Sequence, residues 1–268
     1  MKGIIFYFST TGNTKLACQY IKSNIKDVEF ELFDITKANA PNLSDYDIVG
    51  FATYCDFWAP GKLMREFIAN LSPVASIPAF VFNTFGRING NALSLLAKAV
   101  VEAGFSLIEA HALHVPENYP PMIKAGMTFD DSPNTGETEE FNAFISSINE
   151  KAVKIINNES VEEKIVKSKI GFTLGRASVI ALNANSMGKK ELHEDKCNGC
   201  AICSKVCPYD AIAMVNDNPE FNEAKCNSCF SCYNKCPSFA IYTKKLDCVG
   251  HYPKPHAKLI NKFKESRS

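Results

Sequence analysis

The sequence of 268 residues lacks several features that would assign it to whole classes of protein. It has no run of about eighteen uncharged apolar residues, so no membrane span is expected. Its 29 basic and 29 acidic residues cancel, which argues against bulk nucleic-acid or membrane-surface binding. The start, Met1–Phe8, lacks the basic segment and long apolar centre of a signal peptide. With no low-complexity segment either, an ordinary globular protein is predicted.

Cysteine, by contrast, is abundant and unevenly distributed. Eight of the 11 cysteines fall in two runs, 197–208 and 226–237, which share the pattern Cys-x-x-Cys-x-x-Cys-x-x-x-Cys-Pro. Such fixed spacing predicts reduced, metal-binding thiolates rather than a disulfide framework. A reducing, cytoplasmic compartment is therefore expected. Of the other three, Cys18 is expected to be buried in a helix, and neither Cys55 nor Cys248 has a role that the pattern indicates.

The spacing is typical of bacterial [4Fe–4S] ligation, in which the fourth cysteine of each run binds the other cluster. It predicts two clusters. The first would be held by Cys197, Cys200, Cys203 and Cys236, and the second by Cys226, Cys229, Cys232 and Cys207. Zinc is the competing metal for Cys-x-x-Cys pairs, but a duplicated run with a fourth cysteine before proline disfavours it. This region, about 187–245, looks like a two-cluster bacterial ferredoxin.

The first 157 residues alternate between strand-like and helix-like segments. Apolar runs predict strands at 2–8, 28–34, 47–53, 77–85 and 105–113. Helical spacing follows Thr14 and recurs at 61–71, 92–103 and 138–156. Such alternation predicts a parallel sheet with helices on both faces, whose ligands bind at the carboxyl ends of the strands.

A hydroxyl-rich loop joins the first strand to the first helix. It comprises Ser9, Thr10, Thr11, Gly12, Asn13 and Thr14. Backbone N–H groups at a helix N-terminus, together with hydroxyl donors, suit a phosphate group. The alternative is that the hydroxyl groups only cap the helix.

Two further strand ends carry residues that suit a flat ring system. The first set is Thr53, Tyr54, Cys55, Asp56, Phe57 and Trp58, and the second is Asn83, Thr84, Phe85, Gly86, Asn89 and Gly90. Aromatic side chains over a cleft suit stacking on such a ring. The alternative is a loop anchored by its own aromatic residues.

These motifs carry a resemblance to known families. Residues 1–157 resemble flavodoxins through the Ser9–Thr14 loop and the five-strand alternation. The resemblance implies bound FMN, with its phosphate in that loop and its isoalloxazine between the loops that start at Thr53 and Asn83. With the ferredoxin-like region, the chain resembles the fused flavodoxin–ferredoxin proteins of anaerobic bacteria and archaea, the EFR1-type ferrodoxin family.

The expected architecture is a five-stranded parallel, doubly wound α/β domain followed by a small α+β ferredoxin-like domain. The expected parts are a flavodoxin-like domain (1–157), a helical linker (158–186), the ferredoxin-like domain (187–250) and a solvated basic tail (251–268). This organisation predicts electron transfer among FMN, two [4Fe–4S] clusters and external redox proteins in anaerobic metabolism.

Two alternatives remain open. One is a cluster-fed flavin reductase of a small organic substrate, with His111 and His114 as proton donors near the long segment 114–136. The other is a domain without FMN that serves only for docking. The proline-rich segment 114–136 is expected to be functional, and it would cover the flavin.

Overall fold

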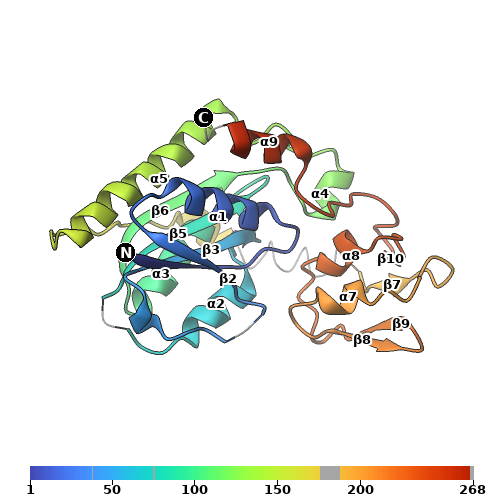
Figure 1. The fold of residues 1–268 in the computed structure, drawn as a ribbon. Coiled ribbons are helices and arrows are strands. Elements are labelled where there is room, and N and C mark those ends of the chain that lie inside the picture. Colours follow the sequence, from blue (N-terminus) through green and yellow to red (C-terminus); the bar gives the residue numbers. More distant parts are fainter. Residues whose placement is uncertain (38, 75, 176–187, 266–268) are drawn as a thin grey trace.

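The computed structural model describes residues 1–37, 39–74, 76–175 and 188–265, and it contains a large α/β domain beside a small cysteine-rich module (Figure 1). The large domain is built on five parallel strands in the order β2-β1-β3-β5-β6. They are β1 (Lys2–Tyr7), β2 (Glu29–Asp34), β3 (Ile48–Asp56), β5 (Pro78–Phe85) and β6 (Ser106–His114). This is the doubly wound order of flavodoxin-like sheets, so the predicted fold class is observed.

Helices cover both faces of the sheet because successive strand residues point to opposite sides. On β1, Ile5 packs against α1 (Asn13–Asn24) and α5 (Thr135–Ile156), whereas Ile4 faces the opposite core cluster with α2 (Lys62–Ala69) and α3 (Ala92–Glu102). A two-residue strand, β4 (Ala59–Pro60), pairs with the end of β3, and a 3₁₀ turn, η1 (Leu43–Asp45), precedes β3. The carboxyl ends of the parallel strands point toward the module (Figure 1).

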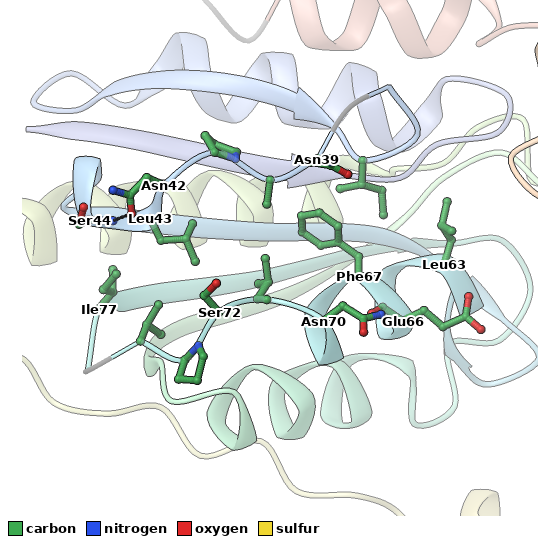
Figure 2. Close-up of a pocket in the computed structure, with 16 residues that line it drawn as sticks. Asn39, Asn42, Leu43, Ser44, Leu63, Glu66, Phe67, Asn70, Ser72 and Ile77 are labelled. Atoms are coloured by element: carbon green, nitrogen blue, oxygen red, sulfur yellow. Dashed lines mark hydrogen bonds between the residues drawn. The ribbon is translucent and has the colours of Figure 1, made fainter.

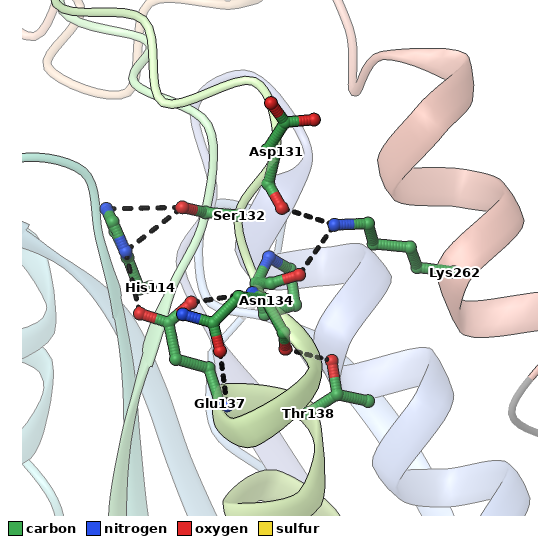
Figure 3. A network of polar contacts seen from close by, with 8 residues as sticks. His114, Asp131, Ser132, Asn134, Glu137, Thr138 and Lys262 are labelled. Carbon is green, nitrogen blue, oxygen red and sulfur yellow. Dashed lines mark hydrogen bonds and ion pairs between the residues drawn. The ribbon is translucent and has the colours of Figure 1, made fainter.

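The C-terminal segment returns to the large domain as helix α9 (Ala257–Glu265). Its apolar residues Leu259 and Phe263 join the core beneath α1 and α5, and Phe263 stacks on Tyr20 with ring centroids 5.0 Å apart. Lys262 donates hydrogen bonds to the backbone carbonyls of Asp131 and Pro133 (Figure 3). The prediction of a solvated tail at 251–268 is therefore wrong for this helix, because Leu259 and Phe263, four residues apart on one helix face, are buried against the domain.

The first part of the linker is not helical. Residues 159–169 have no regular secondary structure, and the Lys164 backbone N–H donates to the carbonyl of Leu107 at 2.7 Å. Residues 170–175 are helical, and Asn91 ties this turn to α3 through its contacts with Lys169. The rest of the expected linker helix, from residue 176, lies outside the described residues.

The cysteine-rich module is an α+β unit with an internal repeat. Its elements are β7 (Glu191–Leu192), α7 (Ile202–Lys205), β8 (Ile212–Val215), β9 (Asn218–Phe221), α8 (Ser231–Lys235) and β10 (Ile241–Tyr242). Strands β8 and β9 form one antiparallel ribbon, and β7 and β10 form another. Short helices α7 and α8 begin at equivalent points of the two cysteine runs, after Ala201 and Phe230, which share a left-handed φ of 55° and 56°. Within the part of the chain described, no helix is long and apolar enough to cross a membrane.

Candidate functional site

A cavity of about 300 Å³ lies at the carboxyl ends of β3, β5 and β6, against the module. Ligands of doubly wound sheets bind at this edge. Four strand-end loops of the large domain, after β1, β3, β5 and β6, and two residues of the module form its wall. The lining residues are Thr10, Asn13, Tyr54, Cys55, Asp56, Phe57, Trp58, Thr84, Phe85, Gly86, Arg87, Ile88, Val115, Pro116, Glu117, Asn118, Tyr119, Met122, Ser228 and Cys229.

The aromatic loop after β3 is a tight two-residue hairpin. Asp56 pairs with Ala59 across the turn, so Phe57 and Trp58 occupy its centre with φ of 45° and 64°. Two central residues with positive φ match the type I′ turn that favours Asn and Gly. Bulky aromatic residues rarely adopt this conformation, and such strain concentrates at functional sites. The turn holds both side chains in the wall of the cavity.

Trp58 packs against two glycines and the linker. A Cβ added at Gly90 would lie 2.5 Å from the Trp58 Cβ, so only glycine fits there. Gly175 approaches the far edge of the indole, and Phe172 contacts it edge-on with ring centroids 4.8 Å apart. The linker therefore contacts the indole, which also lines the cavity.

Polar contacts bind the strand-end loops to one another. The Cys55 thiol donates to the carbonyl of Asn89 at 3.3 Å, and the Asn83 amide donates to the Asn89 side-chain oxygen at 2.6 Å. Gly86 lies against the Glu117 carboxylate, where a Cβ would meet Oε2 at 2.4 Å. The cavity thus has a braced wall, and Cys55 has a structural contact that its position in the sequence did not indicate.

The Ser9–Thr14 loop is tied down by its own side chains. Asn118 Nδ2 donates to Thr11 Oγ1 at 2.7 Å, the hydroxyls of Thr14 and Thr84 are 2.8 Å apart, and Asn13 Nδ2 donates to the carbonyl of Pro116 at 3.0 Å. These bonds hold the loop at the sheet edge. The first backbone amides of α1 have no carbonyl one helical turn earlier to accept them, so they can serve an anion.

The chain that follows the cysteine module closes over this loop. The buried Tyr252 hydroxyl donates to Asn13 Oδ1 at 2.9 Å, and Pro255 lies against Gly12, whose φ is 115°. The Lys235 ammonium, at the end of α8, donates to the carbonyl of Thr11 at 3.4 Å. The loop is therefore enclosed by residues that lie more than 200 positions away in the sequence.

Three buried polar atoms around the cavity have no hydrogen-bond partner among the described residues. They are Thr53 Oγ1, Tyr54 OH and Asn83 Oδ1, at the carboxyl ends of β3 and β5. Burying an unpaired polar group costs about 1–3 kcal/mol, so such atoms usually have a ligand or water partner. Of these three residues only Tyr54 lines the cavity, and its hydroxyl and the aromatic wall fit a ligand that has a planar ring and polar edges, such as FMN.

The structure brings most of the predicted flavin residues to the cavity, but not all. Those that line it are Thr10, Asn13, Tyr54, Cys55, Asp56, Phe57, Trp58, Thr84, Phe85 and Gly86. Those that do not line it are Ser9, Thr11, Gly12, Thr14, Thr53, Asn83, Asn89 and Gly90. Sequence reasoning missed Arg87, Ile88, Ser228 and Cys229 as lining residues. For Val115–Tyr119, the expectation that segment 114–136 covers the flavin was the only indication that these residues lie at the cavity.

Each of two cavities in the module is lined by four cysteines. One is lined by Cys207, Cys226, Cys229 and Cys232, and the other by Cys197, Cys200, Cys203 and Cys236. These are the same quartets that the spacing predicts. Each draws three cysteines from one run and the last from the other. Four thiols around one space are the donor set of a [4Fe–4S] cluster.

The surroundings of the thiols differ between the two quartets. Burial raises the pKa of the Cys229 thiol to about 12, whereas N–H and hydroxyl donors from Ser238 and Ala240 outweigh burial and lower the pKa of Cys236. Lys190 is buried beside Cys226, and its ammonium donates to Ser228 Oγ at 3.2 Å. Because thiols must lose their protons to bind metal, assembly at the Cys229 quartet is coupled to proton release.

The two histidines expected as proton donors lie away from the cavity. His111 is stacked among Phe82, Phe141 and Phe144, and burial lowers its pKa to about 4. The His114 Nδ1 lies 2.9 Å from Glu137 Oε1 and 3.0 Å from Ser132 Oγ (Figure 3). Neither histidine lines the cavity, so both have structural surroundings.

A larger hollow lies on another part of the large domain. Its volume is about 1080 Å³, and Leu43, Leu63, Phe67 and Ile77 line it together with Asn39, Asn42 and Glu66 (Figure 2). The predicted site residues are not among those that form its wall. Size alone does not connect this hollow to the chemistry of the chain.

Comparisons with known proteins match the two parts separately. A family model described as a 4Fe-4S dicluster domain matches residues 189–237. A flavodoxin from the domain Archaea shares 19% identity and a TM-score of 0.45, over 57% of this chain and 99% of its own. Oxidised flavodoxin 1 from Bacillus cereus shares 19% identity and a TM-score of 0.44, over 56% and 98% respectively. A search of curated proteins gave no match.

Proposed function

We propose that the chain transfers electrons between one FMN and two [4Fe–4S] clusters held in the same molecule. The observation that carries the proposal is the cavity whose wall combines the aromatic loop of residues 54–58 with Cys229 of a cysteine quartet. A ligand in that cavity would lie against a cluster site. Covalent connection of two redox centres replaces a bimolecular encounter with a high effective concentration.

In the proposed arrangement, the protein positions the centres and tunes their surroundings. The Ser9–Thr14 loop and the amides at the start of α1 would hold the FMN phosphate, and Tyr54, Phe57 and Trp58 would border its ring. When bound, FMN exchanges one or two electrons, and each cluster exchanges one. External redox proteins would deliver or remove the electrons. Tyr119, which lines the cavity and contacts Phe230 of the module, would exclude water from the space between the centres.

Reduction of a small substrate at the flavin is the second candidate. The volume of about 300 Å³ lies at the lower end of ligand pockets, which span about 300–1,000 Å³. FMN would take up much of that space. Since neither His111 nor His114 lines the cavity, the contacts favour the electron-transfer protein over the reductase.

An anaerobic spectroelectrochemical titration tests the proposal. We expect one FMN and about eight iron atoms per chain, with reversible redox transitions for both kinds of centre. Cys229→Ser should lose about half of the iron, whereas the matched control Cys248→Ser should lose none, because Cys248 lines neither quartet. Reconstituted protein without flavin absorbance, or with iron well below eight, would contradict the proposal.

A further inference from the structure

We infer that the quartet of Cys207, Cys226, Cys229 and Cys232 holds the cluster that exchanges electrons with the flavin, and that the other cluster is the outer terminal. This order deepens the proposed function and rests on it. We call this quartet the inner quartet, and Cys197, Cys200, Cys203 and Cys236 the outer quartet. The internal repeat of the module does not by itself distinguish the two. The way the module docks against the sheet does distinguish them.

The wall of the flavin cavity supplies the first argument. Ser228 and Cys229 line that cavity, and Cys229 also lines the cavity of its own quartet. One side chain therefore separates the two spaces. The other quartet, Cys197, Cys200, Cys203 and Cys236, contributes no residue to the wall of the flavin cavity.

The interface between the domains supplies the second argument, because its contacts come from the second cysteine run, from the segment after it, and from Tyr209, two residues after Cys207 of the inner quartet. Asn234, on α8, donates to the carbonyl of Asn118 at 3.1 Å. Phe230 contacts Tyr119 edge-on at 5.7 Å between ring centroids, and Tyr119 contacts Phe57 in the same way at 5.9 Å. These three rings form a continuous apolar contact from the flavin loop to the inner quartet, and they bring the second run toward the sheet edge.

Exposure supplies the third argument. Cys200 is exposed to solvent, whereas each cysteine of the inner quartet is buried or half-buried. Phe239, three residues after the outer-quartet residue Cys236, is a large apolar residue that is 42% exposed. An external redox protein can approach the outer quartet without displacing the contacts between the domains.

Lys190 distinguishes the inner quartet electrostatically. Its ammonium is buried between Cys226, Ser228 and Glu223, and it lies over the Phe230 ring. A fixed cation beside a cluster stabilises the form with the extra electron and raises its reduction potential. The inner cluster would therefore accept electrons more readily than it would without this lysine.

Rapid-reaction spectroscopy on the loaded, full-length protein tests the order. Electron exchange inside one molecule gives a phase whose rate does not depend on protein concentration. Cys203→Ser removes a ligand of the outer cluster only, and Cys232→Ser is the matched change in the inner one. We expect the concentration-independent change in flavin absorbance to survive in Cys203→Ser and to be lost in Cys232→Ser.

The reverse pattern would overturn the inferred order while leaving the proposed function intact. A wild-type protein that holds FMN and both clusters, but shows no concentration-independent phase, would instead defeat the proposed function. Iron and flavin contents are measured for each variant, so that loss of a whole module is recognised.

A second pair of variants keeps all eight cysteines in place. Lys190→Met should lower the potential of one cluster in a titration followed by electron paramagnetic resonance, and should alter the rate of the internal phase. Lys196→Met is the control, because Lys196 is exposed and contacts the non-ligand Cys248 at 3.2 Å. Unchanged potential and rate in Lys190→Met, or a larger rate change in Lys196→Met, would contradict the order.

Discussion

The hydroxyl of Tyr252 makes a hydrogen bond between the two ends of the chain, and its removal has a calculable cost. It donates to Asn13 Oδ1, 239 positions earlier, and the two residues are 1% and 2% exposed. In Tyr252→Phe, Asn13 keeps its bond to the carbonyl of Pro116 but its oxygen loses its donor. A buried acceptor without a partner costs about 1–3 kcal/mol of folding free energy.

Thermal unfolding of the protein, purified without air, measures this cost. At about 2–4 °C per kcal/mol, we expect the Tm of Tyr252→Phe to fall by roughly 2–12 °C. Because Asn13 belongs to the proposed phosphate loop, FMN should also bind more weakly, by up to about tenfold if 1.4 kcal/mol of the loss is expressed in binding. The affinity is measured from the fluorescence change when FMN is added to the flavin-free protein.

Tyr242→Phe is the matched control. The Tyr242 hydroxyl donates to Glu191 Oε2 at 2.9 Å, but both side chains are half-exposed and water can replace the bond. Its stability should change by no more than about 0.5 kcal/mol, and FMN affinity should be unchanged. Equal losses in the two variants, or none in Tyr252→Phe, would refute the view that Tyr252 holds the loop from across the chain.

Three further predictions concern stability. Phe263→Ala should cost about 3–5 kcal/mol and make the C-terminal segment sensitive to limited proteolysis, and unchanged proteolysis would contradict the docking of α9. Ion pairs from Lys151 and Lys164 outweigh burial and lower the pKa of Glu109 to about 2, below the unfolded value of about 4.3. The stabilisation that ionised Glu109 gives the folded state is therefore complete above about pH 4.3 and is lost as the pH falls toward 2. A Glu109→Gln variant whose acid unfolding is the same as that of the unaltered protein would contradict this. Burial lowers the pKa of His111 to about 4, from about 6.5 when unfolded, so protonation destabilises the fold between these values. In His111→Phe, Tm should fall less as the pH is lowered through that range. If the dependence of Tm on pH were unchanged in this variant, His111 would not be the cause of the fall.

The sequence predicts those parts of the site whose residues lie close together along the chain. Ligand spacing within Cys197–Cys207 and Cys226–Cys236 is local, so it indicates the metal and the quartets without a fold. The hydroxyl-rich loop after β1 is equally local. Apolar runs and helical spacing also predicted the five parallel strands and each long helix of the large domain to within a few residues, but not the two-residue strand β4.

Residues that function through distant contacts were harder to predict. Arg87 and Ile88 follow a predicted strand end, but nothing in their pattern distinguishes lining residues from loop residues. The tail was expected to be solvated because its lysines dominate its composition. Only the packing of Leu259 and Phe263 on α1 and α5 reveals it as a helix of the core.

By itself, the sequence determined the doubly wound sheet, the phosphate-type loop and the two cysteine quartets, because each depends on periodicity or spacing within a short segment. The tertiary structure alone decided which quartet adjoins the cavity at the sheet edge, how Tyr252 and Pro255 enclose the loop, and where the last helix packs. Those outcomes depend on how two domain surfaces fit together. No local pattern encodes that fit, since the contacting residues are separated by a hundred or more positions.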